Sequence, residues 1–134
     1  MSARYLTAVT TAAIGTAAYA CVPDLPEGGR RIESAHYTLA YRARPSPIAV
    51  GRHFAIEFAV CANDGTIMPE SVRVDAHMPE HKHGMNYKAS IKPEAGGRYR
   101  AEGLMFHMPG RWELIFELRA AGGSDRLTDS EVIE

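Results

Sequence analysis

The stretch from residue 111 to residue 119 reads RWELIFELR, and it decides the fold class of this 134-residue chain. Its apolar set is Trp112, Leu114, Phe116 and Leu118. Charged residues occupy most of the positions between them, and Ile115 is the one exception. A period of two is typical of a β-strand with one buried face and one wet face, because successive side chains point to opposite sides. We therefore expect a strand here, with the apolar set facing the core.

The same period of two recurs along the chain. It is clear over residues 53–60 and 72–78, and weaker or shorter over 37–41, 89–91, 98–102 and 127–133. Turn-forming residues such as Asn63-Asp64-Gly65 and Pro109-Gly110 separate these runs. No window after residue 20 carries a convincing helical stripe, and residues 21–34 read as a partly irregular lead-in. About seven short strands separated by turns predict an all-β fold, an antiparallel β-sandwich.

Composition restricts the class of protein further. The 15 Lys+Arg and 16 Asp+Glu give a formal net charge of −1, so no basic surface points to nucleic acid as a partner. A hydrophobic share of 46% is that of a globular chain, and the length suits a single domain. The two cysteines are too few for a disulfide-rich miniprotein or a four-cysteine zinc site.

The N-terminal segment predicts export. Residues 1–20 carry one charge, Arg4, then an apolar Ala/Thr-rich run that ends in Ala18-Tyr19-Ala20. This is the pattern of a cleavable signal peptide, and the run is too short for a transmembrane helix. We expect a single domain over residues 21–134, located in the periplasm or secreted, with no membrane span in the mature chain.

Cleavage at that point would leave Cys21 at the new N-terminus. One interpretation is a disulfide with Cys61, the only other cysteine, which an oxidising compartment would favour. The other is a lipid anchor on Cys21, for which Ala18 and the bulky Tyr19 are a poor match. We prefer the disulfide, and both interpretations stay open on sequence alone.

Histidine and methionine gather in two segments. Residues 77–85 read HMPEHKHGM and residues 105–110 read MFHMPG, and together they hold four of the six His and four of the six Met. Imidazole and thioether groups are copper ligands, the thioether favouring Cu(I). In an extended chain His81, His83 and Met85 would point the same way. We expect these three as first ligands, with His77, His107 and Met105 as further candidates.

A structural interpretation competes with the metal site. Met78 and Met108 have the parity of core residues, and Met is a common gap-filler in cores. The loop between Pro79 and Gly84 could use its histidines only to hydrogen-bond carbonyl groups. Zinc is less attractive than copper, since no thiol is left if the disulfide forms.

The same segments resemble the YtkA-like and FixH-like group of exported bacterial domains. The shared pattern is approximately MP-x-H-x-HGM, then G-x-Y, then EG-hydrophobic-x-F-x-MPG-x-W, and it covers residues 72–118. The matched positions are Met78, Pro79, His81, His83, Gly84, Met85, Met108, Pro109, Gly110 and Trp112. The resemblance implies an immunoglobulin-like β-sandwich outside the cytoplasm, and some members accompany copper handling or respiratory-oxidase assembly. FixH-like proteins are membrane-anchored, whereas this chain shows only a cleavable signal.

Three functions remain, in order of preference. The first is a copper-binding or copper-handling accessory, whose binding should weaken below about pH 6 as imidazoles take up protons. The second is a metal-free interaction module with an exported or membrane protein partner, in which a Pro109-Gly110 turn merely directs Trp112 into the core. The third is a metal enzyme, but no phosphate loop or nucleophile motif is present, so we expect no catalysis and no cofactor other than copper.

Overall fold

The computed structural model describes residues 23, 25 and 29–134 of the chain. The predicted signal peptide and the predicted disulfide partner or lipidation site, Cys21, lie outside the described residues. Within the described residues no helix is long and apolar enough to cross a bilayer.

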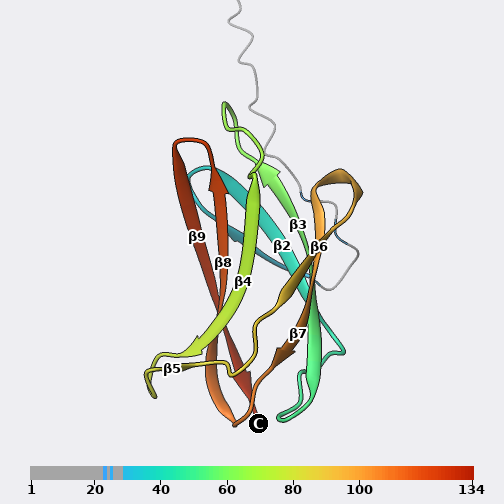
Figure 1. The fold of residues 1–134 in the computed structure, drawn as a ribbon, viewed down its shortest axis with the longest axis vertical. Coiled ribbons are helices and arrows are strands. Elements are labelled where there is room, and N and C mark those ends of the chain that lie inside the picture. Colours follow the sequence, from blue (N-terminus) through green and yellow to red (C-terminus); the bar gives the residue numbers. More distant parts are fainter. Residues whose placement is uncertain (1–22, 24, 26–28) are drawn as a thin grey trace, which may run out of the picture.

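In the described part of the chain the regular secondary structure is almost entirely β-strand (Figure 1). Its nine strands are β1 (Arg30–Glu33), β2 (Tyr37–Arg44), β3 (His53–Ala62), β4 (Ser71–Met78), β5 (His83–Gly84), β6 (Ser90–Pro93), β7 (Arg98–Met105), β8 (Gly110–Ala120) and β9 (Gly123–Ile133). A single 3-10 turn, η1 (Ala95–Gly97), joins β6 to β7. Every strand predicted from alternation is present, which confirms the all-β class.

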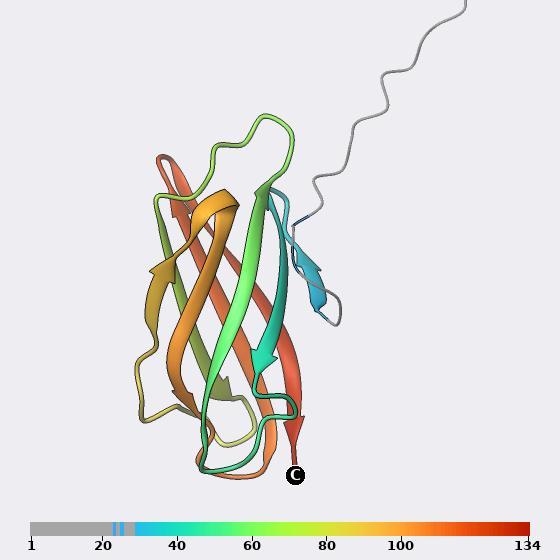
Figure 2. The same cartoon turned by 90° about the vertical axis from the view of Figure 1, so that its right-hand side faces the viewer.

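The strands form two antiparallel sheets that pack face to face (Figure 2). One sheet has the order β1-β2-β3-β7-β6 and the other β5-β4-β8-β9. Without the short β1 and β5, these orders are those of the A-B-E-D and C-F-G sheets of an immunoglobulin constant domain. The predicted immunoglobulin-like sandwich is therefore confirmed.

The core lies between the sheets and consists of the inward halves of the strands. The apolar set of β8, from Trp112 to Leu118, is fully buried. It packs against residues of the other sheet, where the Phe116 ring contacts Tyr41 and Phe58 at centroid distances of 5.2 and 5.4 Å. Ile115, the exception to the alternation, is also buried, although it pairs on the outer face with Asp75 and Thr128.

Within the partly irregular lead-in predicted for residues 21–34, Arg30–Glu33 forms the short strand β1, which the sequence did not predict. The sequence RRIE has no alternation that could signal a strand. Instead, Arg30 holds β1 in place by pairing with Asp129 at 2.7 Å and Glu131 at 2.8 Å across the open side of the sandwich. This ion-pair set joins β1 of one sheet to β9 of the other.

The two ends of the sandwich are named here by their connections. The lower end holds the β4–β5 turn, the β7–β8 link and the C-terminus (Figure 1). The upper end holds the β3–β4 connection and the β8–β9 hairpin. Both His/Met segments therefore meet at the lower end.

Candidate functional site

The first His/Met segment forms a turn and not an extended strand. The backbone N–H of His81 donates to the carbonyl of Met78 at 3.2 Å, and Lys82 has a left-handed φ of 54°. The chain then returns as β5, in which His83 pairs with Met78 and Gly84 with His77. The turn still brings the rings of His81 and His83 to a centroid distance of 5.8 Å.

The pairing with Met78 decides where His83 points. Residues opposite each other in an antiparallel pair lie on the same face, and the Met78 side chain is buried in the core. His83 therefore lies on the inner side of its sheet. Its ring comes within 5.2 Å of His107 and 6.0 Å of Trp112, measured between centroids.

The second segment is held by aromatic packing. The ring of Phe106 is buried and stacks on Trp112 with 4.5 Å between centroids and 12° between planes. The next residue, His107, meets Trp112 edge-on at 5.3 Å. The Trp112 indole Nε1–H donates to the Met108 carbonyl at 3.0 Å, which fixes the link between β7 and β8.

Gly110 explains the glycine of the MPG-x-W motif. Its φ of 126° is unfavourable for residues with a Cβ, and a Cβ there would lie 2.8 Å from the Cε of Met78. Met78, Gly110 and Trp112 thus have the structural role that the sequence allowed for them. They make up the packed layer next to the histidines.

Three histidines, His81, His83 and His107, form a continuous group that we call the imidazole cluster. Two imidazoles that share one ion stand with their ring centres roughly 5 to 6 Å apart, given metal–nitrogen bonds of about 2 Å. The centroid distances of 5.8 and 5.2 Å match that separation. In the described residues, however, no three His, Cys, Asp or Glu side chains already stand in a metal-binding arrangement.

One nitrogen of the cluster is chemically unusual. Nδ1 of His107 is buried and has no hydrogen-bond partner among the described residues. Buried polar atoms in native structures nearly always have a partner, because an unpaired one loses its hydration without compensation. This atom is consequently a candidate ligand position.

The remaining predicted ligands occupy three different places. Met85, two residues after His83, is half-buried against the core, and its N–H donates to the Ala76 carbonyl at 3.2 Å. His77 faces the outer side of its sheet, where its Nε2 lies 3.3 Å from the Glu113 carboxylate. Met105 ends β7 on the outer face of the other sheet.

His77 keeps one connection with the cluster. A hollow of about 350 Å³ at the β4–β5 turn is lined by both His77 and His83, together with Pro79 and Lys82. The structure therefore brings His81, His83 and His107 together, and it leaves His77 and Met105 at the margin of the group.

A family comparison covers both segments that build this site. The YtkA-like family model matches residues 33–117. The chain belongs to the YtkA-like family. This confirms the resemblance inferred from the MP-x-H-x-HGM and MPG-x-W patterns, both of which lie within the matched range.

A solved structure shares the fold of this YtkA-like domain. It is the crystal structure of a DUF4426 family protein from Pseudomonas aeruginosa, with a TM-score of 0.55 and 11% sequence identity. The likeness covers 79% of this chain and 94% of the other. At that identity it supports the sandwich architecture alone. No curated protein matches the sequence.

The cysteine of the YtkA-like domain lies away from the imidazole cluster. Cys61 is half-buried in β3, opposite Thr38 of β2 and near the upper end. Cys61 is not among the metal ligands predicted from the sequence. Its proposed pairing with Cys21 stays a prediction.

The upper end carries a histidine of a different kind. Nδ1 of His36 lies 2.8 Å from Oδ1 of Asp125, and the hydroxyl of Ser34 donates to Oδ2 of the same carboxylate. Burial alone would raise the pKa of Asp125, but the hydrogen bonds from Ser34 and His36 outweigh it and lower that pKa. His36 and Asp125 border a hollow of about 300 Å³ that is also lined by Thr66 and Ile67.

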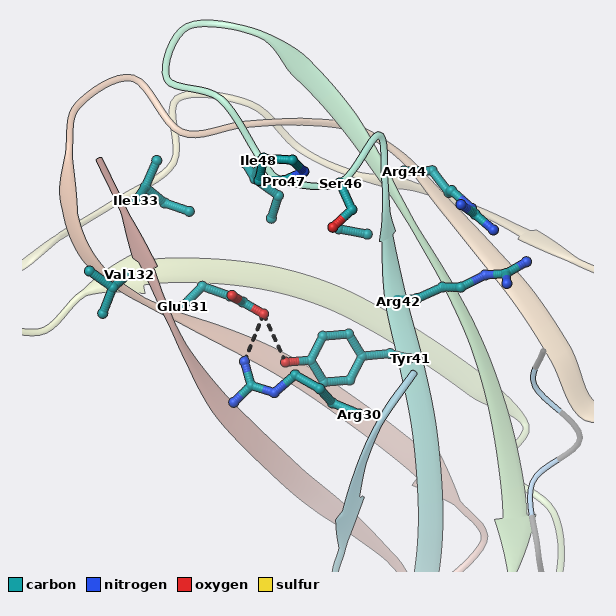
Figure 3. A pocket seen from close by; sticks show the side chains of 11 residues that line it. Arg30, Tyr41, Arg42, Arg44, Ser46, Pro47, Ile48, Glu131, Val132 and Ile133 are labelled. Carbon is teal, nitrogen blue, oxygen red and sulfur yellow. Dashed lines mark hydrogen bonds and ion pairs between the residues drawn. The ribbon is translucent and has the colours of Figure 1, made fainter. Parts of the chain in front are cut away.

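A larger hollow, of about 430 Å³, lies between β2 and the end of β9 (Figure 3). Arg30, Tyr41 and Glu131 point toward one another there, and the Tyr41 hydroxyl donates to Asp129 at 2.9 Å. Burial and these carboxylates raise the pKa of Tyr41. Because these polar groups already satisfy one another, the hollow presents no group poised for a ligand.

Proposed function

We propose that this YtkA-like domain is an exported copper-binding accessory that holds the ion at the imidazole cluster. The ligands are His81, His83 and His107, with the Met85 thioether as the soft neighbour. The domain carries and presents the ion and does not catalyse a reaction. Its place of work is the periplasm or the cell exterior, as the N-terminal sequence predicts.

The observation that carries the proposal is the unpartnered nitrogen of His107 next to two neighbouring imidazoles. Among the described residues no carboxylate pairs with His81, His83 or His107, and the single hydrogen bond of their rings is the 3.3 Å contact of His83 Nδ1 with the Gly84 carbonyl oxygen. A soft metal ion would satisfy such nitrogens, because each imidazole can offer one lone pair. The family match over these segments is compatible with this role.

The donor set favours copper over zinc and harder ions. Imidazole serves both Cu(I) and Cu(II), and thioether prefers Cu(I). Structural zinc sites use four ligands and favour thiolates, which this cluster does not offer. A small rotation of His81 and His83 on the exposed turn would be needed to aim three nitrogens at one ion, and such a turn can supply it.

The test uses the one tryptophan of the sequence as a local reporter. Trp112 touches both His83 and His107, so an ion bound at the cluster should quench its fluorescence. The purified chain is titrated with Cu(I), Cu(II) and Zn(II), then dialysed and analysed for metal. We expect one equivalent of copper at the cluster, quenched Trp112 emission, and little retained zinc.

Variants decide whether the cluster is the site. The double variant His81→Ala/His83→Ala, and separately His107→Ala, should lower copper affinity at least 100-fold and abolish the quenching. His36→Asn at the upper end is the matched control and should leave both unchanged. If the double variant binds Cu(I) and Cu(II) as tightly as the parent, the proposal is wrong.

A metal-free interaction module is the second candidate. The β3–β4 connection exposes two large apolar side chains, Ile67 and Met68, at the upper end. This exposed pair is the observation that favours a protein partner. Absence of any retained metal, together with capture of one exported partner that Ile67→Ser/Met68→Ser abolishes, would support this function instead.

A further inference from the structure

His53 and Met105 stand opposite each other on the outer face of the five-stranded sheet, at the lower end. β3 begins at His53, β7 ends at Met105, and the register pairs these two residues. The next pair in the register, Phe54 with Leu104, is buried in the core. Since faces alternate along a strand, His53 and Met105 share the outward side.

A tyrosine flanks this pair. The ring of Tyr87, from the connection between β5 and β6, meets His53 edge-on with 5.1 Å between centroids. His53 is itself exposed, so the contact with Tyr87 leaves its imidazole accessible to solvent. No ion pair or side-chain hydrogen bond engages the His53 ring among the described residues.

The chemistry of the pair selects a soft, singly charged ion. Residues directly opposite in an antiparallel pair have Cβ atoms about 5 Å apart, so an imidazole nitrogen and a thioether sulfur can approach one ion from two sides. Neutral imidazole with thioether is a donor set for Cu(I) and not for hard cations. The exposed neighbours in sequence, Arg52 and Lys88, repel a doubly charged ion twice as strongly as a singly charged one.

We propose that His53 and Met105 form a second binding site, for Cu(I) or its analogue Ag(I), with Tyr87 as its wall. Met105 lies two residues from His107, so the second site adjoins the imidazole cluster. The proposal goes beyond the copper site above, and neither site requires the other.

The experiment follows the methyl groups of methionine by NMR while Ag(I), which cannot change oxidation state in this setting, is added to the purified chain. We expect the Met105 ε-methyl signal to shift, and a total of two retained equivalents of Ag(I). Met105→Leu and His53→Asn should each remove one equivalent, and His53→Asn should also abolish the Met105 shift. Met68→Leu is the control, because Met68 is an exposed methionine at the upper end, away from His53.

The two proposed sites can be refuted independently of each other. In the His81→Ala/His83→Ala variant the Met105 shift should persist, even if the imidazole cluster never binds copper. An unshifted Met105 signal, or an unchanged Ag(I) stoichiometry in Met105→Leu, would overturn the second site and leave the first untouched. Zn(II) at the same concentration should not shift Met105, and a zinc response as large as that of Ag(I) would also count against the proposal. Circular dichroism of each variant checks that the fold is retained.

Discussion

The two ends of the sandwich use histidine in opposite ways. At the upper end His36 is tied to the Asp125 carboxylate, which Ser34 also engages. At the lower end the ring of His83 lies beside those of His81 and His107, and its Nδ1 lies 3.3 Å from the Gly84 carbonyl oxygen. The buried Nδ1 of His107 has no partner among the described residues. Hydrogen-bonded histidines hold structure together, whereas unpaired imidazoles keep lone pairs for a ligand.

Residue type alone therefore does not identify a site. His36 and His107 have the same side chain on the same sandwich, and only their neighbours separate a structural role from a candidate ligand role. Variants that remove these neighbours therefore test whether the two ends differ as described.

The largest effect is expected when the Trp112 side chain is removed from the lower end of the sandwich. Trp112→Ala deletes a fully buried ring, its stack on Phe106 and its hydrogen bond to the Met108 carbonyl. The free energy of unfolding should fall by about 3–5 kcal/mol. Urea unfolding followed by far-UV circular dichroism measures this loss, and a decrease below about 1 kcal/mol would contradict the described packing.

A smaller loss is expected from Gly110→Ala. The added Cβ would lie 2.8 Å from Cε of the buried Met78, at a φ of 126°. Overpacking and backbone strain together should cost about 1–3 kcal/mol, and the same urea experiment measures it. Gly123→Ala, where a Cβ meets nothing within 4 Å, is the control and should change stability little.

At the upper end, Asp125→Asn should cost about 1 kcal/mol at neutral pH, because two hydrogen bonds to a charged acceptor are weakened. The pKa of Asp125 is lower in the folded chain than in an unfolded one. Its contribution is therefore present above the ordinary carboxyl pKa and is lost as the pH falls through the lowered value. Stability measured from pH 7 to pH 3 should show the gap between parent and variant closing, and a gap that widens in acid would refute this assignment.

The smallest effect directly compares the two kinds of histidine. His36→Ala removes a partnered ring and should cost about 0.5–1 kcal/mol, whereas His81→Ala removes an exposed ring without a hydrogen-bond partner and should cost almost nothing without metal. Thermal unfolding in the presence of a chelator measures both. Equal losses would mean that the two ends do not differ as described. With copper present, only His81→Ala should lose metal-dependent stabilisation.

The fold was largely predictable because burial on one face leaves a period of two in the sequence. The strands around Phe58, Val74 and Phe116 follow that period, and each is present. The strands that the sequence missed, β1 and β5, are short and are placed by tertiary contacts: Arg30 with Asp129 and Glu131 for β1, and Met78 for β5. Neither the ion pairs of β1 nor the pairing of β5 with Met78 produces a recognisable pattern in the sequence of the strand itself.

The candidate site was predictable only in part. His81 and His83 were correctly grouped, although the chain between them turns where an extended segment was expected. His77 is only six residues from His83 in sequence. The alternation of faces along β4 nevertheless directs its side chain to the outer face of the sheet, against Glu113. His53 carried no signal beyond its position at the start of a strand, since its partner Met105 is 52 residues away.

The sequence by itself determined the sandwich, the buried faces, the YtkA-like motif and the two segments in which histidine and methionine gather. Those are local properties, because alternation and turn chemistry act over a few residues. Only the tertiary structure decided which histidines meet. The pairing of His83 with Met78 and the packing of Phe106 on Trp112 bring His107 to the cluster, and the β3–β7 register brings His53 to Met105. Contacts between distant residues depend on how the sheets pair and pack, and that is a property of the whole chain.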